Sequence, residues 1–239
     1  MSTEQPRPQT RRQDAAKSVF HPLTRALLIL TFTTGVVDAV SYLGLGKVFT
    51  ANMTGNVVLL GFGIAGAAKL PVLSPLISLG AFLVGAGLGG ALAVRLAGAH
   101  SRHITFALAI EAGLIAIAAL LAAAIDIHPS TVTGDVVIAL LAFAMGVRNA
   151  TIRRVAVPDL TTTVLTMTLT GLAADSVLAG GSGEGSTRRA AAVLAMLLGA
   201  LVGALALKTS LLLALTIALA LVLLTWLLYI PGLGRERRR

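Results

Sequence analysis

Long runs of apolar residues, separated by short polar breaks, cover most of the chain after residue 22. A helix that crosses a bilayer needs roughly 20 predominantly apolar residues. Eight segments approach that length, at about residues 24–45, 48–68, 74–96, 104–125, 136–152, 161–180, 190–207 and 210–230. The runs do not alternate as a half-buried strand does. Because backbone polar groups in hydrocarbon must be paired internally, the pattern predicts an all-α, polytopic membrane helix bundle.

The placement of basic residues favours six crossings over eight, because cytoplasmic loops carry an excess of Lys and Arg. If all eight segments cross and the N-terminus is cytoplasmic, seven of the 19 Lys and Arg residues fall outside. If the second and sixth segments enter and return on the same side, 16 lie inside, and Lys47, Lys69 and Lys208 lie outside. We therefore expect six crossings plus two re-entrant hairpins and two cytoplasmic termini, with eight crossings as the alternative.

The two halves of the chain share a pattern. The stretch GVVDA at residues 35–39 is echoed by GVRNA at residues 146–150. A polar segment follows in each half, and the next apolar run contains two glycines four apart: Gly85 and Gly89, then Gly199 and Gly203. Each half therefore reads as span, polar hairpin, span, span. Three crossings per half would orient the halves oppositely, so we expect inverted repeats, as in many secondary transporters.

These observations divide the chain into five parts. We expect a basic cytoplasmic tail at residues 1–22, a first membrane repeat at 23–125, an external loop at 126–135, a second membrane repeat at 136–230 and a basic cytoplasmic tail at 231–239. The first apolar run is longer than a signal-peptide core and has no clear cleavage site, so we interpret it as a retained span.

Ionisable residues inside apolar runs are functional candidates, since a charge in hydrocarbon is costly. Asp38 lies midway along the first run, and the corresponding region of the second half contains Arg148 and Asn149. We expect Arg148 to act as the counter-ion of Asp38 in a proton- or cation-coupled site. The alternative is a packing role, with Asp38 bonded to Arg148 or to Ser41, Thr33 or Thr34. Glu111 and Asp175 are weaker candidates.

The polar segments of the two hairpins provide further candidates. Several polar side chains and a glycine at membrane depth suit a broken helix that lines a cavity. Its N-terminus would present N–H groups to an anionic or polar solute. The alternative is that these side chains join helices by hydrogen bonds. The candidate substrate-binding residues are Asp38, Asn52, Thr54, Gly55, Asn56, Arg148, Asn149, Thr166 and Thr168.

The stretch GVVDAVSYLGLGKVFTANMTGNVVLLG, residues 35–61, resembles the YoaK family of bacterial multi-pass membrane proteins, whose domain has no assigned function. Residues 146–173 are similar to the second block of that family, although Thr166-Met167 stands where a Thr-Gly pair is expected. The resemblance covers roughly residues 25–230. It implies a helical fold in the bacterial plasma (inner) membrane and leaves the substrate open.

Composition narrows the functional classes. Only 12% of residues are charged and 56% are hydrophobic, which is unlike a soluble enzyme. The net charge of +9 comes from residues that flank apolar runs, so we expect no nucleic-acid partner. The chain has no cysteine and no recognised catalytic motif, and we expect no enzymatic activity, cofactor or metal.

The sequence therefore predicts a permease or channel-like carrier for a small solute. Its expected partners are the lipid bilayer and that solute, and a homo-oligomer is a further option. A structural or interaction protein without transport is the main alternative. An intramembrane enzyme acting on a lipid-like substrate is a lesser one.

Overall fold

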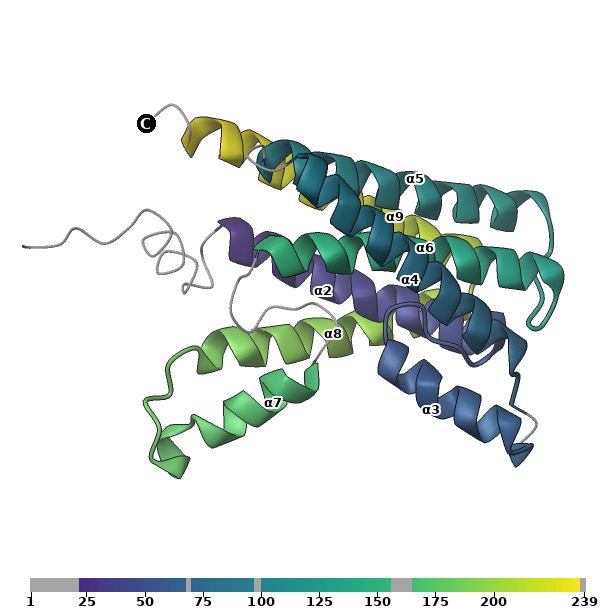
Figure 1. Cartoon of the computed structure of the whole chain (residues 1–239), viewed down its shortest axis with the longest axis horizontal. Coiled ribbons are helices and arrows are strands. Elements are labelled where there is room, and N and C mark those ends of the chain that lie inside the picture. Colours follow the sequence, from purple (N-terminus) through teal and green to yellow (C-terminus); the bar gives the residue numbers. More distant parts are fainter. Residues whose placement is uncertain (1–21, 68–69, 97–99, 156–164, 237–239) are drawn as a thin grey trace, which may run out of the picture.

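The computed structural model describes residues 22–67, 70–96, 100–155 and 165–236. These residues form helices and contain no strand, which confirms the all-α prediction for this part of the chain (Figure 1). The elements are α2 (Pro22–Val40), the π-helical η1 (Ser41–Gly46), α3 (Met53–Ile64), α4 (Leu73–Arg95), α5 (His100–Ala124), α6 (Val132–Val155), α7 (Leu165–Ala174), the 3-10 helix η3 (Val177–Ala179), α8 (Ser186–Leu207) and α9 (Leu211–Glu236). Helix α9 continues past residue 230 into the segment expected as a tail.

Six stretches are long and apolar enough to cross a membrane: Pro22–Gly46, Leu73–Arg95, Arg102–Ala124, Val132–Arg154, Ser186–Leu207 and Leu211–Leu228. Helices α3 and α7 have 12 and 10 residues. At 1.5 Å per residue they are about 18 Å and 15 Å long, which is less than the roughly 30 Å of a hydrocarbon core. Among the described residues, these two helices are too short to cross alone.

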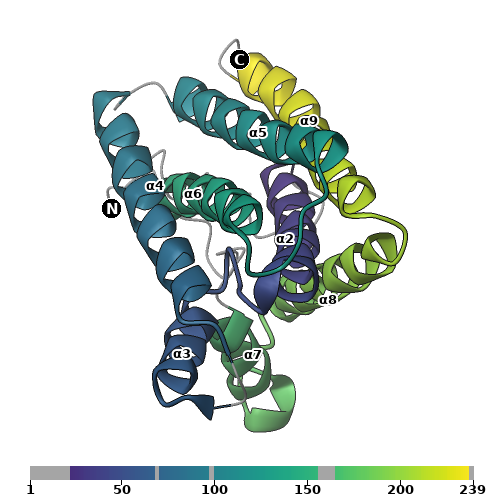
Figure 2. The same ribbon diagram turned by 90° about the vertical axis from the view of Figure 1, so that its right-hand side faces the viewer.

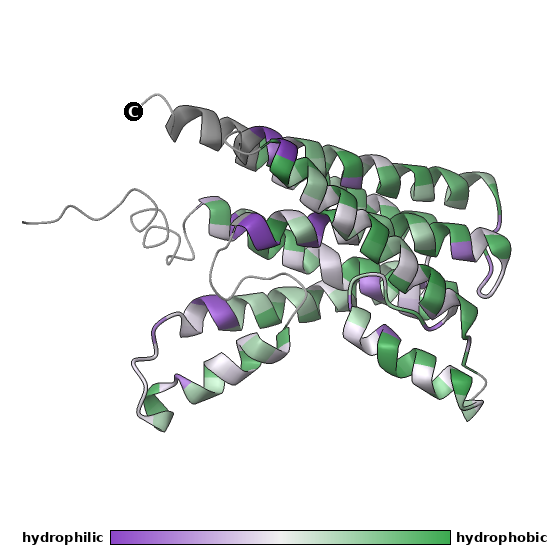
Figure 3. Ribbon diagram, viewed as in Figure 1, coloured by the Kyte–Doolittle hydropathy of each residue, from purple (hydrophilic) through white to green (hydrophobic). Residues whose placement is uncertain are grey.

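The long helices run in alternating directions along one axis. In Figure 1, α2, α5 and α8 run towards one end of the bundle, and α4, α6 and α9 run back. Helices α3 and α7 both begin near the middle of this axis, and they diverge towards opposite ends. Figure 2 shows α2 inside the bundle, with α6, α8 and α9 around it. In Figure 3 most of the length of the long helices is hydrophobic, as a lipid-facing bundle requires.

Two helix crossings bring backbones into contact at glycines. Helix α2 packs on α8, and α4 packs on α6. A Cβ atom at Gly199 would fall on the carbonyl oxygen of Phe32, and one at Gly85 would fall on that of Phe143. Gly35 faces the carbonyl oxygen of Met196 in the same way. These glycines therefore have the close-packing role expected from their spacing.

The most enclosed helices contain the polar interior. In the spans that begin at Pro22 and Val132, 67% and 61% of residues are buried, against 22% in the spans that begin at Leu73 and Ser186. Asp38 lies on the first of these enclosed spans and Arg148 on the second. Asp38 and Arg148 are thus on the two spans with the least room for lipid or water.

Candidate functional site

Asp38 is a buried carboxylate with one oxygen in use and one free. It lies in the last turns of α2, and its exposed fraction is 5%. Its Oδ1 accepts hydrogen bonds from the backbone N–H groups of Thr50, at 3.1 Å, and Ala51, at 2.9 Å. Its Oδ2 has no hydrogen-bond partner among the described residues. Because buried polar atoms are normally paired, this unpaired oxygen makes Asp38 the leading site candidate.

The loop that donates to Asp38 is held in place by Asn56. The side-chain oxygen of Asn56 accepts from the backbone N–H of Phe49 at 2.8 Å, and its Nδ2 donates to the carbonyl oxygen of Phe49 at 2.6 Å. Asn56 Nδ2 also donates to Ser78 Oγ at 3.1 Å, which joins the loop to α4. Asn56 and Ser78 are fully buried. The sequence candidate Asn56 therefore positions the loop.

Asn52 and Gly55 form the start of α3. Asn52 is the N-cap, and its Oδ1 accepts from the backbone N–H of Gly55 at 3.2 Å. The ring of Phe49 lies against Gly55, because a Cβ there would be 2.8 Å from the ring carbon Cδ2. Gly55 thus leaves room for an aromatic ring. Thr54 is exposed on the outer surface of α3.

A cavity opens beside Asp38, between the end of α2 and α8. Its volume is about 370 Å³. It is lined by Gly35, Asp38, Ala39, Tyr42, Leu43, Phe49, Asn52, Met196, Ala200 and Ala204. The rings of Tyr42 and Phe49 stack, with centroids 4.8 Å apart and planes 21° apart. We call this space the Asp38 cavity. Its size and its mostly apolar lining with few polar groups are typical of small-molecule sites.

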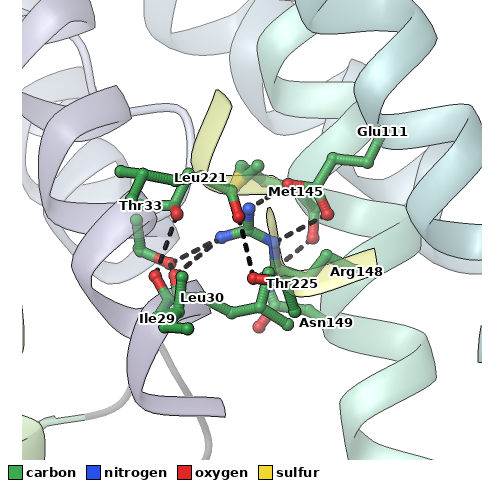
Figure 4. Close-up of polar contacts among 10 residues, drawn as sticks. Ile29, Leu30, Thr33, Glu111, Met145, Arg148, Asn149, Leu221 and Thr225 are labelled. Carbon is green, nitrogen blue, oxygen red and sulfur yellow. Dashed lines mark hydrogen bonds and ion pairs between the residues drawn. The ribbon is translucent and has the colours of Figure 1, made fainter. Parts of the chain in front are cut away.

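Glu111 and Arg148 form a second polar centre, shown in Figure 4. Arg148 Nε donates to Glu111 Oε2 at 2.9 Å, and its Nη2 donates to Glu111 Oε1. Arg148 Nη1 donates to the carbonyl oxygen of Leu30 at 3.0 Å and to Thr34 Oγ1 at 2.9 Å. Both charged side chains are about 1% exposed. The pair joins α5, α6 and α2 in the centre of the bundle.

Arg148 forms its ion pair with Glu111 in place of Asp38, the partner expected from the sequence. Among the described residues, the ionic partner of Arg148 is Glu111, which the sequence had ranked below Asp38. The proposed hydroxyl partners of the Asp38 carboxylate are also engaged elsewhere: Thr33 and Thr34 donate to carbonyl oxygens of their own helix, and Ser41 donates to the backbone oxygen of Asp38. Asp38 instead takes N–H groups from a loop more than ten residues away.

A much smaller cavity, of about 30 Å³, lies beside this ion pair. Its lining is mainly apolar and comes from the first half of α2, the start of α5, the end of α6 and α9. Glu111, Arg148, Thr151 and Thr225 contribute its polar groups. Positions 30, 34 and 38 are four apart on α2, so Thr34 at the ion pair and Asp38 are about 6 Å apart along the helix axis. The two cavities thus lie near one another along α2, with the ion pair beside the smaller one.

The second-half candidates lie outside the Asp38 cavity. Asn149 donates to the carbonyl oxygen of Met145 in its own helix at 2.9 Å. On α7, Thr166 is exposed and Thr168 is buried. Asp175 forms an ion pair with Arg189 at 2.8 Å, and its side chain is 54% exposed. The described part of the second half therefore contributes α8, with Met196, to the cavity.

Several cavity residues were missed by sequence reasoning. Tyr42 and Phe49 are aromatic residues near Asp38, and Met196, Ala200 and Ala204 recur at a spacing of four. A spacing of four places side chains on one helical face, so it marks a shared surface without showing which element faces it. The proximity of α8 to Asp38 is a long-range contact that this pattern leaves undetermined.

Comparison with known proteins identifies the family. Residues 26–230 match the family model described as "Protein of unknown function (DUF1275)". The chain belongs to the DUF1275 family. This DUF1275 chain is also 34% identical, over 154 residues, to the UPF0700 transmembrane protein YoaK of Bacillus subtilis (strain 168). That match covers 62% of this chain and 65% of the relative, so the chain spans a little under two thirds of the relative's length. No solved structure matches it significantly. The chain is thus an integral membrane protein of a family without an assigned activity.

Proposed function

We propose that the protein is a permease or channel-like carrier for a small solute, and that the carboxylate of Asp38 holds this solute. The observation that carries the proposal is Asp38, which is 5% exposed, has a buried Oδ2 without a hydrogen-bond partner among the described residues and lines a cavity of about 370 Å³. An ionisable residue in a membrane segment is costly and usually marks a solute or ion path. A purely structural carboxylate would be expected to have both oxygens paired.

The arrangement of the helices supports an inverted repeat in this carrier. The contact of α2 with α8 is matched by the contact of α6 with α4, because each joins the first span of one half to the second span of the other. Gly199 faces the carbonyl oxygen of Phe32, and Gly85 faces that of Phe143, 111 positions further along the chain than Phe32. The opposed directions of α3 and α7 agree with hairpins that enter from opposite sides (Figure 1). In such transporters the solute site lies between the repeats, and the Asp38 cavity is lined by α2 and α8.

The glycine contacts suggest which parts move together. Because α2 with α8 and α4 with α6 touch backbone to backbone, each pair is expected to move as a unit. The loop at residues 47–52 is tied to α4 through Asn56 and Ser78. Movement of α3, α4 and α6 relative to α2 and α8 would therefore shift this loop across Asp38. Such movement would combine helices from both halves of the chain.

Transport is tested with the purified full chain in liposomes. The vesicles receive a uniformly ¹³C-labelled extract of water-soluble metabolites, and mass spectrometry identifies compounds that enter faster than into protein-free vesicles. We expect Asp38→Asn to slow entry of the transported compound about 10- to 100-fold, because a hydrogen bond to a charged group contributes about 1.5–3 kcal/mol. Asp175→Asn removes a carboxylate outside the cavity and is expected to transport normally. Absence of any protein-dependent entry, or equal entry with Asp38→Asn, contradicts the proposal.

A structural role is the second candidate, and the closed polar networks favour it. Arg148, Glu111, Asn56 and Ser78 are buried and bonded between helices. If the buried polar residues only hold the helices together, the protein transports no solute, and Asp38→Asn lowers its thermal stability. The same vesicle experiment therefore separates the two functions.

The proposed topology has six crossings, two re-entrant hairpins and both termini in the cytoplasm of a bacterium. Single cysteines can be introduced freely because the chain has none. We expect Asp126→Cys to react with an impermeant maleimide added to intact cells, and Arg102→Cys to react only after permeabilisation. Lys208→Cys and Glu184→Cys are controls, outside and inside respectively for both six and eight crossings. Eight crossings would reverse the results at positions 126 and 102.

A further inference from the structure

We infer that the Asp38 cavity binds a small organic ammonium cation with an apolar substituent. The inference rests on the proposed function, because it names the solute class of the same cavity. Three properties of the site lead to it: the charge of its lining residues, the aromatic pair and the engagement of backbone N–H groups near the start of α3.

The lining of the cavity contains one acidic side chain and no basic one. Asp38 is the only charged residue among the residues that line it. Arg148, the expected counter-ion, donates through its Nε and Nη2 to the two carboxylate oxygens of Glu111. Two backbone N–H groups stabilise Oδ1, and Oδ2 remains without a partner. A buried carboxylate is expensive unless it is paired, so the cavity favours a ligand that brings a positive charge and a hydrogen-bond donor.

The remaining lining suits an organic cation better than a metal ion. Tyr42 and Phe49 form a stacked pair in the wall, and aromatic rings attract ammonium groups. Met196, Ala200 and Ala204 form an apolar surface on α8. Calcium and magnesium require several oxygen ligands, and the side chains of this lining provide few. An ammonium group near Asp38, with its apolar part against the rings and α8, uses all of these features.

An anionic solute, which the α3 N-terminus had suggested, fits less well. Three backbone N–H groups near that point are already engaged: Thr50 and Ala51 donate to Asp38, and Gly55 donates to Asn52. An anion would also approach the free Oδ2 of a carboxylate. The helix N-terminus thus serves to hold Asp38 and its loop. The second half has Asn149 at the position that corresponds to Asp38, so the structure supports one cation per chain.

The inference is tested by calorimetric titration of the full chain in lipid nanodiscs. The probe is phenethylammonium chloride, with 2-phenylethanol as its neutral analogue and potassium chloride as an inorganic cation. We expect one phenethylammonium per chain, no saturable binding of the alcohol, and no competition by potassium. Asp38→Asn should weaken binding about 30-fold or more, because it removes the charge that pairs with the ammonium group.

Matched variants test whether the aromatic ring of Tyr42 attracts the cation and whether a loss of binding results from misfolding. Tyr42→Leu should weaken binding about 5-fold, and Tyr42→Phe should leave it unchanged, because the ring and not the hydroxyl attracts the cation. Asp38→Glu, which keeps the charge, should retain part of the affinity. Equal binding by Asp38→Asn that elutes as a folded protein, or equal affinity for the alcohol, overturns the inference.

The outcome is separable from that of the proposed function. Asp38-dependent binding of phenethylammonium without any protein-dependent entry into vesicles leaves the ammonium site standing and refutes transport. Asp38-dependent entry of a compound that lacks an amine, with no phenethylammonium binding, supports transport and refutes the ammonium site.

Discussion

Replacement of Arg148 by methionine is expected to lower the free energy of unfolding by about 3–5 kcal/mol, because it leaves the carboxylate of Glu111 buried without its partner. Glu111 is 0% exposed, so solvent does not compensate. The change also removes donors to the carbonyl oxygen of Leu30 and to Thr34 Oγ1. Unfolding in mixed micelles of increasing sodium dodecyl sulfate content, followed by circular dichroism, measures the loss.

The same substitution at Arg153 is the matched control. Arg153 lies on the same helix, α6, and is exposed. Arg153→Met is therefore expected to change stability by less than about 0.5 kcal/mol. The double variant Glu111→Leu, Arg148→Met removes both charges and should recover most of the stability, since apolar replacement of a whole buried pair is often neutral. Equal losses for Arg148→Met and Arg153→Met, or no recovery in the double variant, would show that the pair is not the cause.

The second large effect is expected at the helix crossings. Gly85→Ala places a methyl group on the backbone of α6 at Phe143, and the backbone cannot rotate away as a side chain can. We expect α4 and α6 to separate locally, with a loss of about 1–3 kcal/mol or more, as in overpacked cores. Gly199→Ala should cost a similar amount, because it meets the carbonyl oxygen of Phe32 in α2.

Gly87 provides the comparison within α4. A Cβ at Gly87 would meet nothing within 4 Å. Gly87→Ala is therefore expected to be neutral or to stabilise the helix by up to about 1 kcal/mol, the difference in helix propensity. The same unfolding measurement compares the three variants. A loss at Gly87→Ala as large as that at Gly85→Ala would rule out the crossing as the cause.

The lengths of the helices show which features of the fold the apolar pattern predicts. Six expected spans correspond to six long helices, since the number of consecutive apolar residues limits how far a helix extends in lipid. The pattern also placed polar hairpins where α3 and α7 lie, but it did not show how short they are. The start of α3 depends on where the loop at residues 47–52 ends, and Asn52 sets that point as the N-cap of α3.

The candidate site illustrates the opposite case. Asp38 stands out in the sequence as a charge inside an apolar run, but its neighbours are not predictable from spacing. Thr50 and Ala51 reach it because the chain turns back after η1, and Met196 reaches it because α8 crosses α2 at a glycine. Thr54 was a candidate site residue like Asn52, but its position in the first turn of α3 directs it outwards.

The sequence by itself determined the membrane class, the helical fold and the family, and it singled out the acidic residue at position 38, because hydrocarbon allows few backbone structures and tolerates few charges. Only the tertiary structure decided that Arg148 pairs with Glu111 and that Asp38 keeps one oxygen free. Ion pairing depends on distances of a few ångströms between different helices. Helix rotation and crossing set those distances, and a linear pattern of residues does not specify them.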